Sequence, residues 1–163
     1  MKRMHTWIGF IALCVGGIVF FTVGAQFIAP WFHGPSNQGV MNHAPTKTIS
    51  INNKPLTLEI VSDPADVKQG LSDRPSMPLG HGMLFLFAVP DRYTFWMPRM
   101  HFPLDILWIQ DGVVVDMTTL PTPKSLGIPA SYKPKTAADH VLELKAGQAE
   151  AYGLSIGSNI LFE

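Results

Sequence analysis

The longest apolar run of the chain lies near its N-terminus. Residues 8–29 contain no charged side chain, and Lys2 and Arg3 precede them. About 20 apolar residues are enough for a helix to cross a membrane, whereas a signal peptide has a shorter apolar core and a cleavage site of small residues. Val23 and Ala25 would supply such a site. Residues 1–29 are therefore predicted to be a transmembrane anchor that contacts the membrane through residues 8–29, or a signal peptide cleaved after Ala25.

Both interpretations give the chain the same orientation. Positive residues stay on the cytoplasmic side of the membrane, so the N-terminus is expected in the cytoplasm and the rest of the chain outside it. An uncleaved chain would be a cell-membrane protein, and a cleaved one would be secreted. Residues 30–46 are rich in Pro, Gly, Ser and Asn and are predicted to be a flexible linker. The folded domain is then expected over residues 47–163.

Short apolar runs alternate with turn residues through this domain. Asn52 and Asn53 separate two alternating runs, and Asp111-Gly112 separates two more, which are the patterns of β-hairpins. A turn is also expected at Pro90-Asp91, between two continuous apolar runs. Strands are predicted at 48–51, 56–60, 83–87, 94–97, 104–109, 113–117, 140–144 and 159–162.

Two short helices complete the predicted elements. Asp63 is a suitable N-cap, Pro64 a suitable first helical residue, and Gly70 a suitable end. A second short helix or turn is expected after Gly147. Seven to eight strands, two short helices and no strand–helix alternation predict a mostly β domain, either a sandwich or a barrel.

Charge and cysteine content narrow the possible functions. The chain carries 12 Lys+Arg and 12 Asp+Glu, and from Lys47 onward ten basic side chains face twelve acidic ones. This balance argues against a nucleic-acid partner, which requires a basic face. The single cysteine, Cys14, lies in the N-terminal apolar segment, so neither an intrachain disulfide nor a catalytic thiol is expected in the domain.

Five ordered motifs resemble a known family. They are GLSDR at 70–74, GMLFLF at 82–87, FWM at 95–97, FPLDIL at 102–107 and VLELKAG at 141–147. Together they resemble domain of unknown function 192 (DUF192), small exported or membrane-linked proteins of bacteria and archaea, over roughly residues 54–162. The resemblance implies a compact, jelly-roll-like β fold and no agreed activity. The chain departs from the family where Lys-Asn-Thr usually follows the FWM motif, since PRMHF stands at 98–102.

The candidate site is a group of polar or amphipathic residues beside apolar motifs. Asp105 stands out because apolar residues flank it at the start of a predicted strand, and a buried carboxylate needs a partner. Arg74 or Arg99 could pair with it in a bidentate geometry. Such a pair would either brace the fold or bind a ligand, and both alternatives remain open. The predicted ligand-binding residues are Arg74, Trp96, Arg99, His101 and Asp105.

Three functions follow from these residues. The first is an extracytoplasmic binding or accessory domain. Its partner would be a small polar ligand, a carbohydrate or another envelope protein, and no cofactor is expected. The second is a periplasmic protein that binds copper or another metal, because thioether and imidazole groups suit copper. Its ligands would be His81, Met97, Met100 and His101. The third is an envelope hydrolase in which Asp105 and Glu143 form a carboxylate pair and His101 acts as the base. We do not expect catalysis to be the main function.

Overall fold

The computed structural model describes residues 44–123 and 129–162. These residues belong to one compact unit, Met41–Glu163. The predicted anchor or signal segment and most of the predicted linker lie outside the described residues. Neither helix in the described part of the chain is long and apolar enough to cross a membrane.

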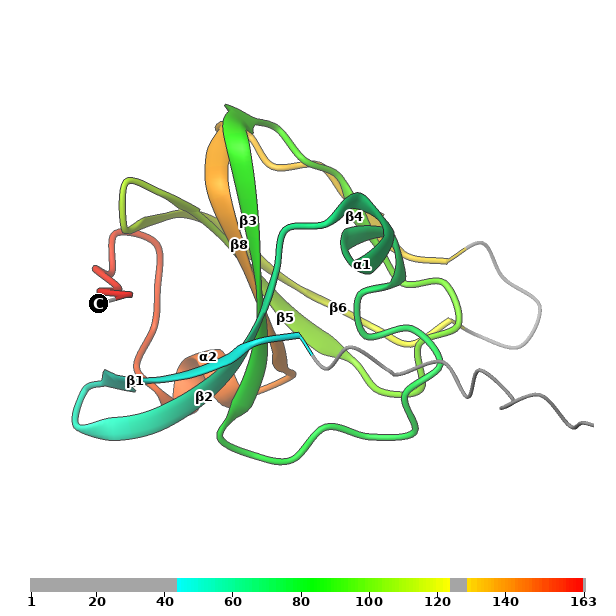
Figure 1. The fold of residues 1–163 in the computed structure, drawn as a ribbon, viewed down its shortest axis with the longest axis horizontal. Helices are drawn as coiled ribbons and strands as arrows, with labels where there is room; N and C mark the ends of the chain where they lie inside the picture. The colour runs from blue at the N-terminus through cyan, green and yellow to red at the C-terminus, as the bar shows by residue number, and fades with distance from the viewer. Residues whose placement is uncertain (1–43, 124–128, 163) are drawn as a thin grey trace, which may run out of the picture. The chain divides into compact units, whose positions relative to one another are not determined.

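A six-stranded sheet and a two-stranded sheet form the domain (Figure 1). The order of the large sheet is β1-β2-β3-β8-β5-β6, and only the β2–β3 pair is parallel. Its strands are β1 (Thr46–Ile51), β2 (Lys54–Val61), β3 (His81–Asp91), β5 (Leu104–Gln110), β6 (Val113–Leu120) and β8 (Ala138–Lys145). The small sheet pairs β4 (Phe95–Trp96) with β7 (Ser131–Tyr132). The helices are α1 (Pro64–Gln69) and α2 (Gln148–Ala151).

Local sequence explains the two hairpins and α1. Asn52, Asn53, Asp111 and Gly112 all have positive φ, as a tight hairpin turn requires. The side chain of Asp63 accepts a hydrogen bond from the amide of Ala65, and α1 ends before Gly70 as expected. The mostly β class, the expected number of seven to eight strands and the two short helices are confirmed.

Three expectations were wrong. The large sheet is open, with β1 and β6 at its edges, so the domain is not a barrel. The turn expected at Pro90-Asp91 is instead part of β3, where an irregular register between Leu86 and Asp91 accommodates a residue that has no amide proton. Residues 159–162 form a single bridge, Val113 with Asn159, rather than a strand.

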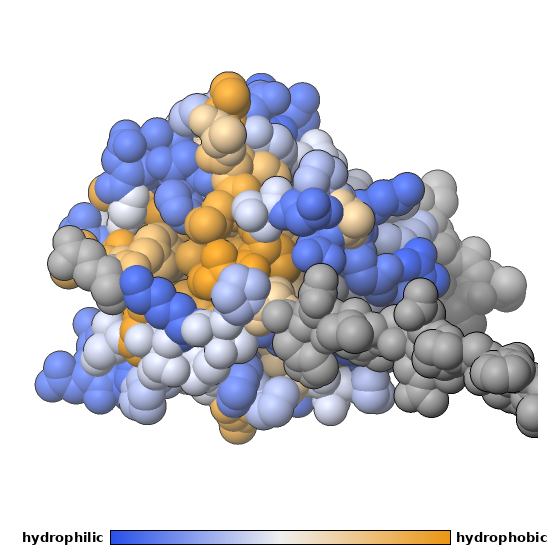
Figure 2. Space-filling view, viewed as in Figure 1, coloured by the Kyte–Doolittle hydropathy of each residue, from blue (hydrophilic) through white to orange (hydrophobic). Residues whose placement is uncertain are grey.

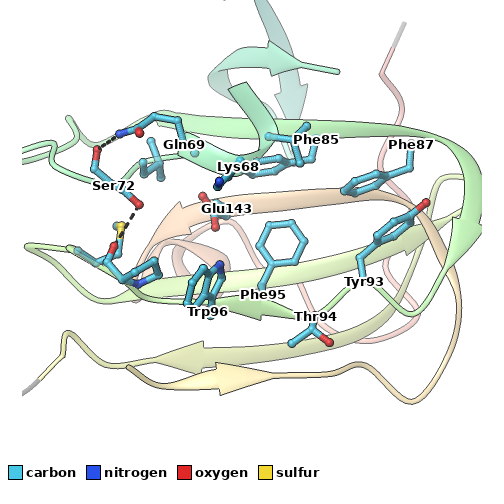
Figure 3. Close-up of a pocket in the computed structure, with 15 residues that line it drawn as sticks. Lys68, Gln69, Ser72, Phe85, Phe87, Tyr93, Thr94, Phe95, Trp96 and Glu143 are labelled. Carbon is cyan, nitrogen blue, oxygen red and sulfur yellow. Dashed lines mark hydrogen bonds between the residues drawn. The ribbon is translucent and has the colours of Figure 1, made fainter. Parts of the chain in front are cut away.

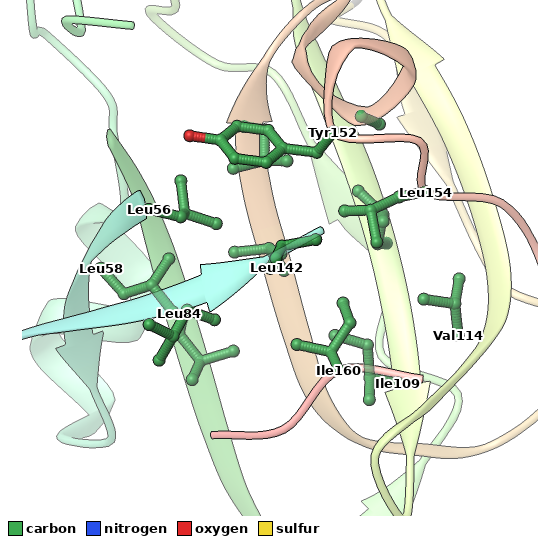
Figure 4. Close-up of a cluster of buried hydrophobic side chains, with 14 residues drawn as sticks. Leu56, Leu58, Leu84, Ile109, Val114, Leu142, Tyr152, Leu154 and Ile160 are labelled. Atoms are coloured by element: carbon green, nitrogen blue, oxygen red, sulfur yellow. The ribbon is translucent and has the colours of Figure 1, made fainter. Parts of the chain in front are cut away.

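Each face of the large sheet carries its own apolar core. The α2-side core gathers β-strand residues with Ala149, Tyr152, Leu154 and Ile160 from the C-terminal segment, and Leu142 of β8 lies among them (Figure 4). The α1-side core includes Phe85, Met97, Phe102, Ile106 and Trp108. Because β8 and β5 lie inside the sheet, their alternate residues are buried on opposite faces.

Partly buried apolar residues pack against both cores. On the α2 side they are Ile60, Leu86, Met117 and Phe162, and on the α1 side they are Ala44, Val67, Phe87, Phe95, Val115, Ala130 and Tyr132. An apolar area surrounded by polar residues is visible near the middle of the face shown in Figure 2. The other face of the large sheet is the one on the side of α1 and the small sheet (Figure 1). The candidate site lies on that face.

Candidate functional site

A pocket of about 200 Å³ opens between α1 and the α1-side face of the large sheet (Figure 3). Three parts of the chain line it: α1 with the loop that follows, β3 with β4, and a single residue of β8, Glu143. Most of its side chains are apolar or aromatic. The lining residues used below are Lys68, Gln69, Ser72, Phe85, Phe87, Tyr93, Phe95, Trp96 and Glu143.

Glu143 is the buried acid of this pocket. Its register neighbours are Met83 on β3 and Ile106 on β5, both almost fully buried. Only 5% of Glu143 is exposed, and its Oε2 has no hydrogen-bond partner in the described structure. Figure 3 shows the carboxyl group rising among the aromatic rings of the pocket. A buried polar atom without a partner is costly, so this carboxyl group needs a particular explanation.

Burial raises the pKa of Glu143 from 4.5 to about 8, and the charge of Arg74 opposes this rise. Arg74 cannot neutralise Glu143 fully because its guanidinium forms a bidentate pair with Glu59, with N–O distances of 2.5 and 2.8 Å. Glu59 and Glu143 occupy the same row of the sheet, separated by Met83. Glu143 is therefore mostly protonated at neutral pH.

Trp108 supports the aromatic walls of the pocket through contacts with Phe95 and Tyr93. Its ring meets Phe95 edge-on at 5.9 Å between centroids, and its indole N–H donates to the carbonyl of Tyr93 at 2.9 Å. Phe95 in turn packs edge-on against Phe85 at 5.0 Å, while Tyr93 stacks on Phe87 at 3.7 Å. Trp108 is fully buried on β5, so a rigid strand positions both pairs of rings.

The small sheet depends on Asp116 of β6. This buried carboxylate accepts hydrogen bonds from the hydroxyl of Tyr132 and the amide of Lys135, at 3.2 and 2.8 Å. Tyr132 also packs against Trp108. Asp116 thus anchors the proline-rich loop that contains β7, and β7 pairs with the strand that carries Phe95 and Trp96.

The loop after α1 is tied to residues 98–100 by polar contacts. The hydroxyl of Ser72 donates to the carbonyl of Pro98, and Gln69 donates to the carbonyl of Ser72. Nε of Arg99 contacts both oxygens of Asp73 at 2.9–3.0 Å, and the two side chains are more than half exposed. These contacts fix the pocket rim, and they occupy most of the polar groups of this loop.

The structure separates the five predicted ligand-binding residues. Trp96 lines the pocket and is 58% exposed, and Arg74 acts on Glu143 through its charge. Arg99 pairs with Asp73 outside the pocket lining, and His101 is exposed. Asp105 lies elsewhere, as described next.

Asp105 belongs to the opposite face of the sheet and has no arginine partner. Oδ1 accepts from the hydroxyl of Thr119 at 2.7 Å, and Oδ2 accepts from the amide of Ala149 at 3.0 Å. Ala149 lies in α2, so Asp105 holds α2 against the sheet. The expected pair with Arg74 or Arg99 was wrong, and so was the carboxylate pair with Glu143, because the two acids project from opposite faces.

The residues of the copper hypothesis differ in their surroundings. Met97 and Met100 are buried in the α1-side core, whereas His101 is exposed and His81 begins β3. In residues 44–123 and 129–162 there is no group of three or more His, Cys, Asp or Glu that could hold a metal ion. That search does not cover thioether ligands, so a copper site at these residues stays a prediction.

Comparison with known proteins identifies the family. The DUF192 model, described as "Uncharacterized ACR", matches residues 47–162. The chain belongs to the DUF192 family. Two solved structures are similar: a protein from Sinorhizobium meliloti 1021 provisionally assigned as a transcription regulator, and a protein of unknown function from Novosphingobium aromaticivorans DSM 12444. The first is 32% identical to this chain, with a TM-score of 0.60. The match covers 70% of this chain and 88% of the other. The second is 26% identical (TM-score 0.57), covering 70% and 81%. No curated protein is significantly similar.

The pocket uses residues from several DUF192 motifs, but it was not predicted from the sequence. Glu143 was considered only as a catalytic carboxylate, and Phe85, Phe87, Tyr93 and Phe95 were not assigned to the site. The sequence did contain an indication of a buried acid. Glu143 lies within the apolar VLELKAG motif, in a strand whose residues are mostly buried. Of the segment that departs from the DUF192 pattern, Pro98 and Met100 reach the pocket wall.

The first prediction concerns Asp105. Asp105→Ala should lower the free energy of unfolding by about 1–3 kcal/mol because the buried amide of Ala149 loses its acceptor, and urea denaturation would measure the loss. Asp63→Ala is the matched control, since it removes a similar bond at an exposed helix start and should cost about 1 kcal/mol. Equal stability of Asp105→Ala and the wild type would contradict a structural role.

The second prediction concerns the pH dependence of stability. Since the pKa of Glu143 is about 8 in the folded chain and 4.5 ordinarily, the folded state holds the extra proton between these values. The free energy of unfolding should therefore fall as pH rises from 4.5 to 8, by up to about 5 kcal/mol. Glu143→Gln should remove this component, as shown by urea denaturation at several pH values.

Glu150→Gln is the control for this experiment, because Glu150 is exposed on α2. Its pH profile should keep the slope of the wild type. Parallel profiles for Glu143→Gln and the wild type would show that the carboxyl group is not the source of the slope.

Proposed function

We propose that the domain is a binding module that holds a small molecule in the pocket over Glu143, and that it works outside the cytoplasm. The observation that carries the proposal is the unpartnered Oε2 of a buried acid at an aromatic-lined pocket. An apolar residue at this position would make the fold more stable, because an unpartnered buried polar group costs about 1–3 kcal/mol. A bound molecule that completes the hydrogen bonding would offset this cost.

Size and rigidity also support a small ligand. A cavity of about 150 Å³ can hold benzene, so 200 Å³ suits a compact molecule of slightly larger size. Trp108 and Asp116 hold the walls from within the large sheet, so little ordering would be required on binding. Concave, mostly apolar sites with a few polar groups are typical of small-molecule binding.

The regulator assignment of one structural neighbour is not carried over to this chain. Ten basic and twelve acidic residues from Lys47 onward do not form the basic excess that DNA binding requires. The extracytoplasmic location rests on the apolar segment 8–29 and the preceding Lys2 and Arg3. The jelly-roll-like class is likewise kept as a proposal from the family resemblance.

The binding function can be tested by NMR titration of the full chain. The panel would contain glucose and N-acetylglucosamine, benzylamine and butylamine, benzoate, and benzyl alcohol. We expect at least one compound to give saturable shifts at the indole N–H of Trp96 and at neighbouring amides. If no compound perturbs residues that line the pocket, the proposal fails.

A matched pair of variants localises any binding. Val67→Trp places a large ring from α1 into the pocket and should abolish the shifts, because Val67 lines the pocket. Val89→Trp makes the same change at a residue that is 67% exposed and outside the pocket lining, and it should bind as the wild type does. Equal binding by both variants would place the ligand elsewhere.

The location can be tested separately with a C-terminal alkaline phosphatase fusion to the full chain. This reporter is active only outside the bacterial cytoplasm. We expect activity, and its loss when charged residues replace part of the apolar run 8–29. An inactive fusion of the unaltered chain would contradict the extracytoplasmic location without affecting the binding proposal.

A further inference from the structure

The pocket offers few polar groups to a ligand. Ser72 and Gln69 line it, but their side chains are already bonded to backbone carbonyls and to Asp73. Glu143 is the buried acid, and Lys68 is exposed on α1 at the rim. A sugar ring carries several hydroxyl groups that each need a partner when buried. This lining therefore favours a ligand with one strongly polar group and an apolar body.

The residues around Glu143 indicate the charge of the ligand's polar group. A carboxylate in an apolar site favours a cation that can donate hydrogen bonds, because a charge-assisted bond is stronger than a neutral one. The walls are aromatic. Phe85, Phe95 and Trp96 lie near the acid, and Phe87 and Tyr93 stand together farther along the pocket (Figure 3). Aromatic faces attract cations within about 6 Å of the ring centre. An anion would meet the same aromatic faces unfavourably.

We propose that the ligand is a small primary amine in its ammonium form, with the N–H groups on the unpartnered Oε2 of Glu143 and the apolar body between the aromatic walls. This inference rests on the proposed binding function and specifies its ligand class. A quaternary ammonium would not suffice, because it has no N–H to donate to Oε2. The pocket volume of about 200 Å³ accommodates an amine of the size of benzylamine.

Gly70 contributes to this arrangement from the end of α1. A Cβ added there would lie 4.0 Å from Oε2 of Glu143 and 3.5 Å from the ring of Phe85. The φ of +49° also favours glycine. The loop backbone therefore comes close to the acid without covering it with a side chain.

Binding of an ammonium ion should be linked to proton release. Burial keeps Glu143 protonated at neutral pH because its pKa is about 8, and the ammonium ion replaces that proton as the partner. Of the nearby ionisable groups, Arg74 acts on Glu143 through its charge and is paired with Glu59. Lys68 and Tyr93 line the same pocket. Arg74 is paired, so it remains charged throughout. Since the pKa of Glu143 is about 8, the dissociation constant should fall about tenfold from pH 6 to 7 and about fivefold from pH 7 to 8.

The test is calorimetric titration of the full chain with benzylamine, benzyl alcohol and benzoate, which share an aromatic body and differ in charge. We expect benzylamine to bind at least tenfold more tightly than the other two at pH 8. We also expect close to one proton to be released per benzylamine at pH 7, measured in buffers of different ionisation enthalpy. This second measurement needs no variant and so does not depend on a variant's folding.

Three substitutions sharpen the result. Glu143→Gln should weaken benzylamine binding at least tenfold and remove its pH dependence, while leaving benzyl alcohol binding within about twofold. Glu150→Gln makes the same change of charge on exposed α2 and should leave benzylamine binding unchanged. Lys68→Ala removes the positive charge at the rim, so benzylamine binding should be unchanged or tighter.

Failure of this inference can be distinguished from failure of the proposed function. If benzoate, benzyl alcohol or a sugar binds in the pocket more tightly than benzylamine, the amine inference is overturned and the binding function stands. Benzylamine binding without proton release, or unaffected by Glu143→Gln, also overturns the inference. If no compound of either panel perturbs the pocket, both proposals fail.

Discussion

The arrangement of this domain depends on the insertion of β8 between β3 and β5. Because β8 is paired on both sides over residues 140–144, its side chains there project alternately into two separate cores. Leu142 and Leu144 contribute to the α2-side core, and Val141 to the α1-side core. Each face then needs a cover, which α2 and the C-terminal segment provide on one side and α1 with the small sheet on the other.

This constraint also separates the two buried acids that are candidates for chemistry. Asp105 projects toward α2, where an amide and a hydroxyl satisfy both of its oxygens. Glu143 projects toward α1, which is too short and too polar to seal the face. The uncovered space becomes the pocket, and the acid in it keeps an oxygen without a partner. The same sheet thus makes one acid structural and leaves the other available to a ligand.

The parts of the fold that depend on neighbouring residues could be predicted from the sequence. The hairpin turns at Asn52-Asn53 and Asp111-Gly112 and the start and end of α1 are determined by local backbone preferences. The strand β7 was missed because Tyr132 is held by distant partners, Asp116 and Trp108. The strand predicted at 159–162 has the right composition but forms an isolated bridge at Asn159, with one further backbone hydrogen bond from the amide of Ile160 to the carbonyl of Gly112. The partner of Asp105 could not be predicted because it depends on the strand order, which no local pattern specifies.

The position of β8 in the sheet has a consequence for how the chain folds. The strand that completes the sheet is the last long one to be synthesised, and its two partners are separated from it by long stretches of chain. Until it arrives, β3 and β5 each present an unpaired apolar edge, which is the kind of surface through which chains aggregate. Non-local pairing of this kind is also slow. The emerging chain is therefore open to edge-to-edge association until β8 is in place.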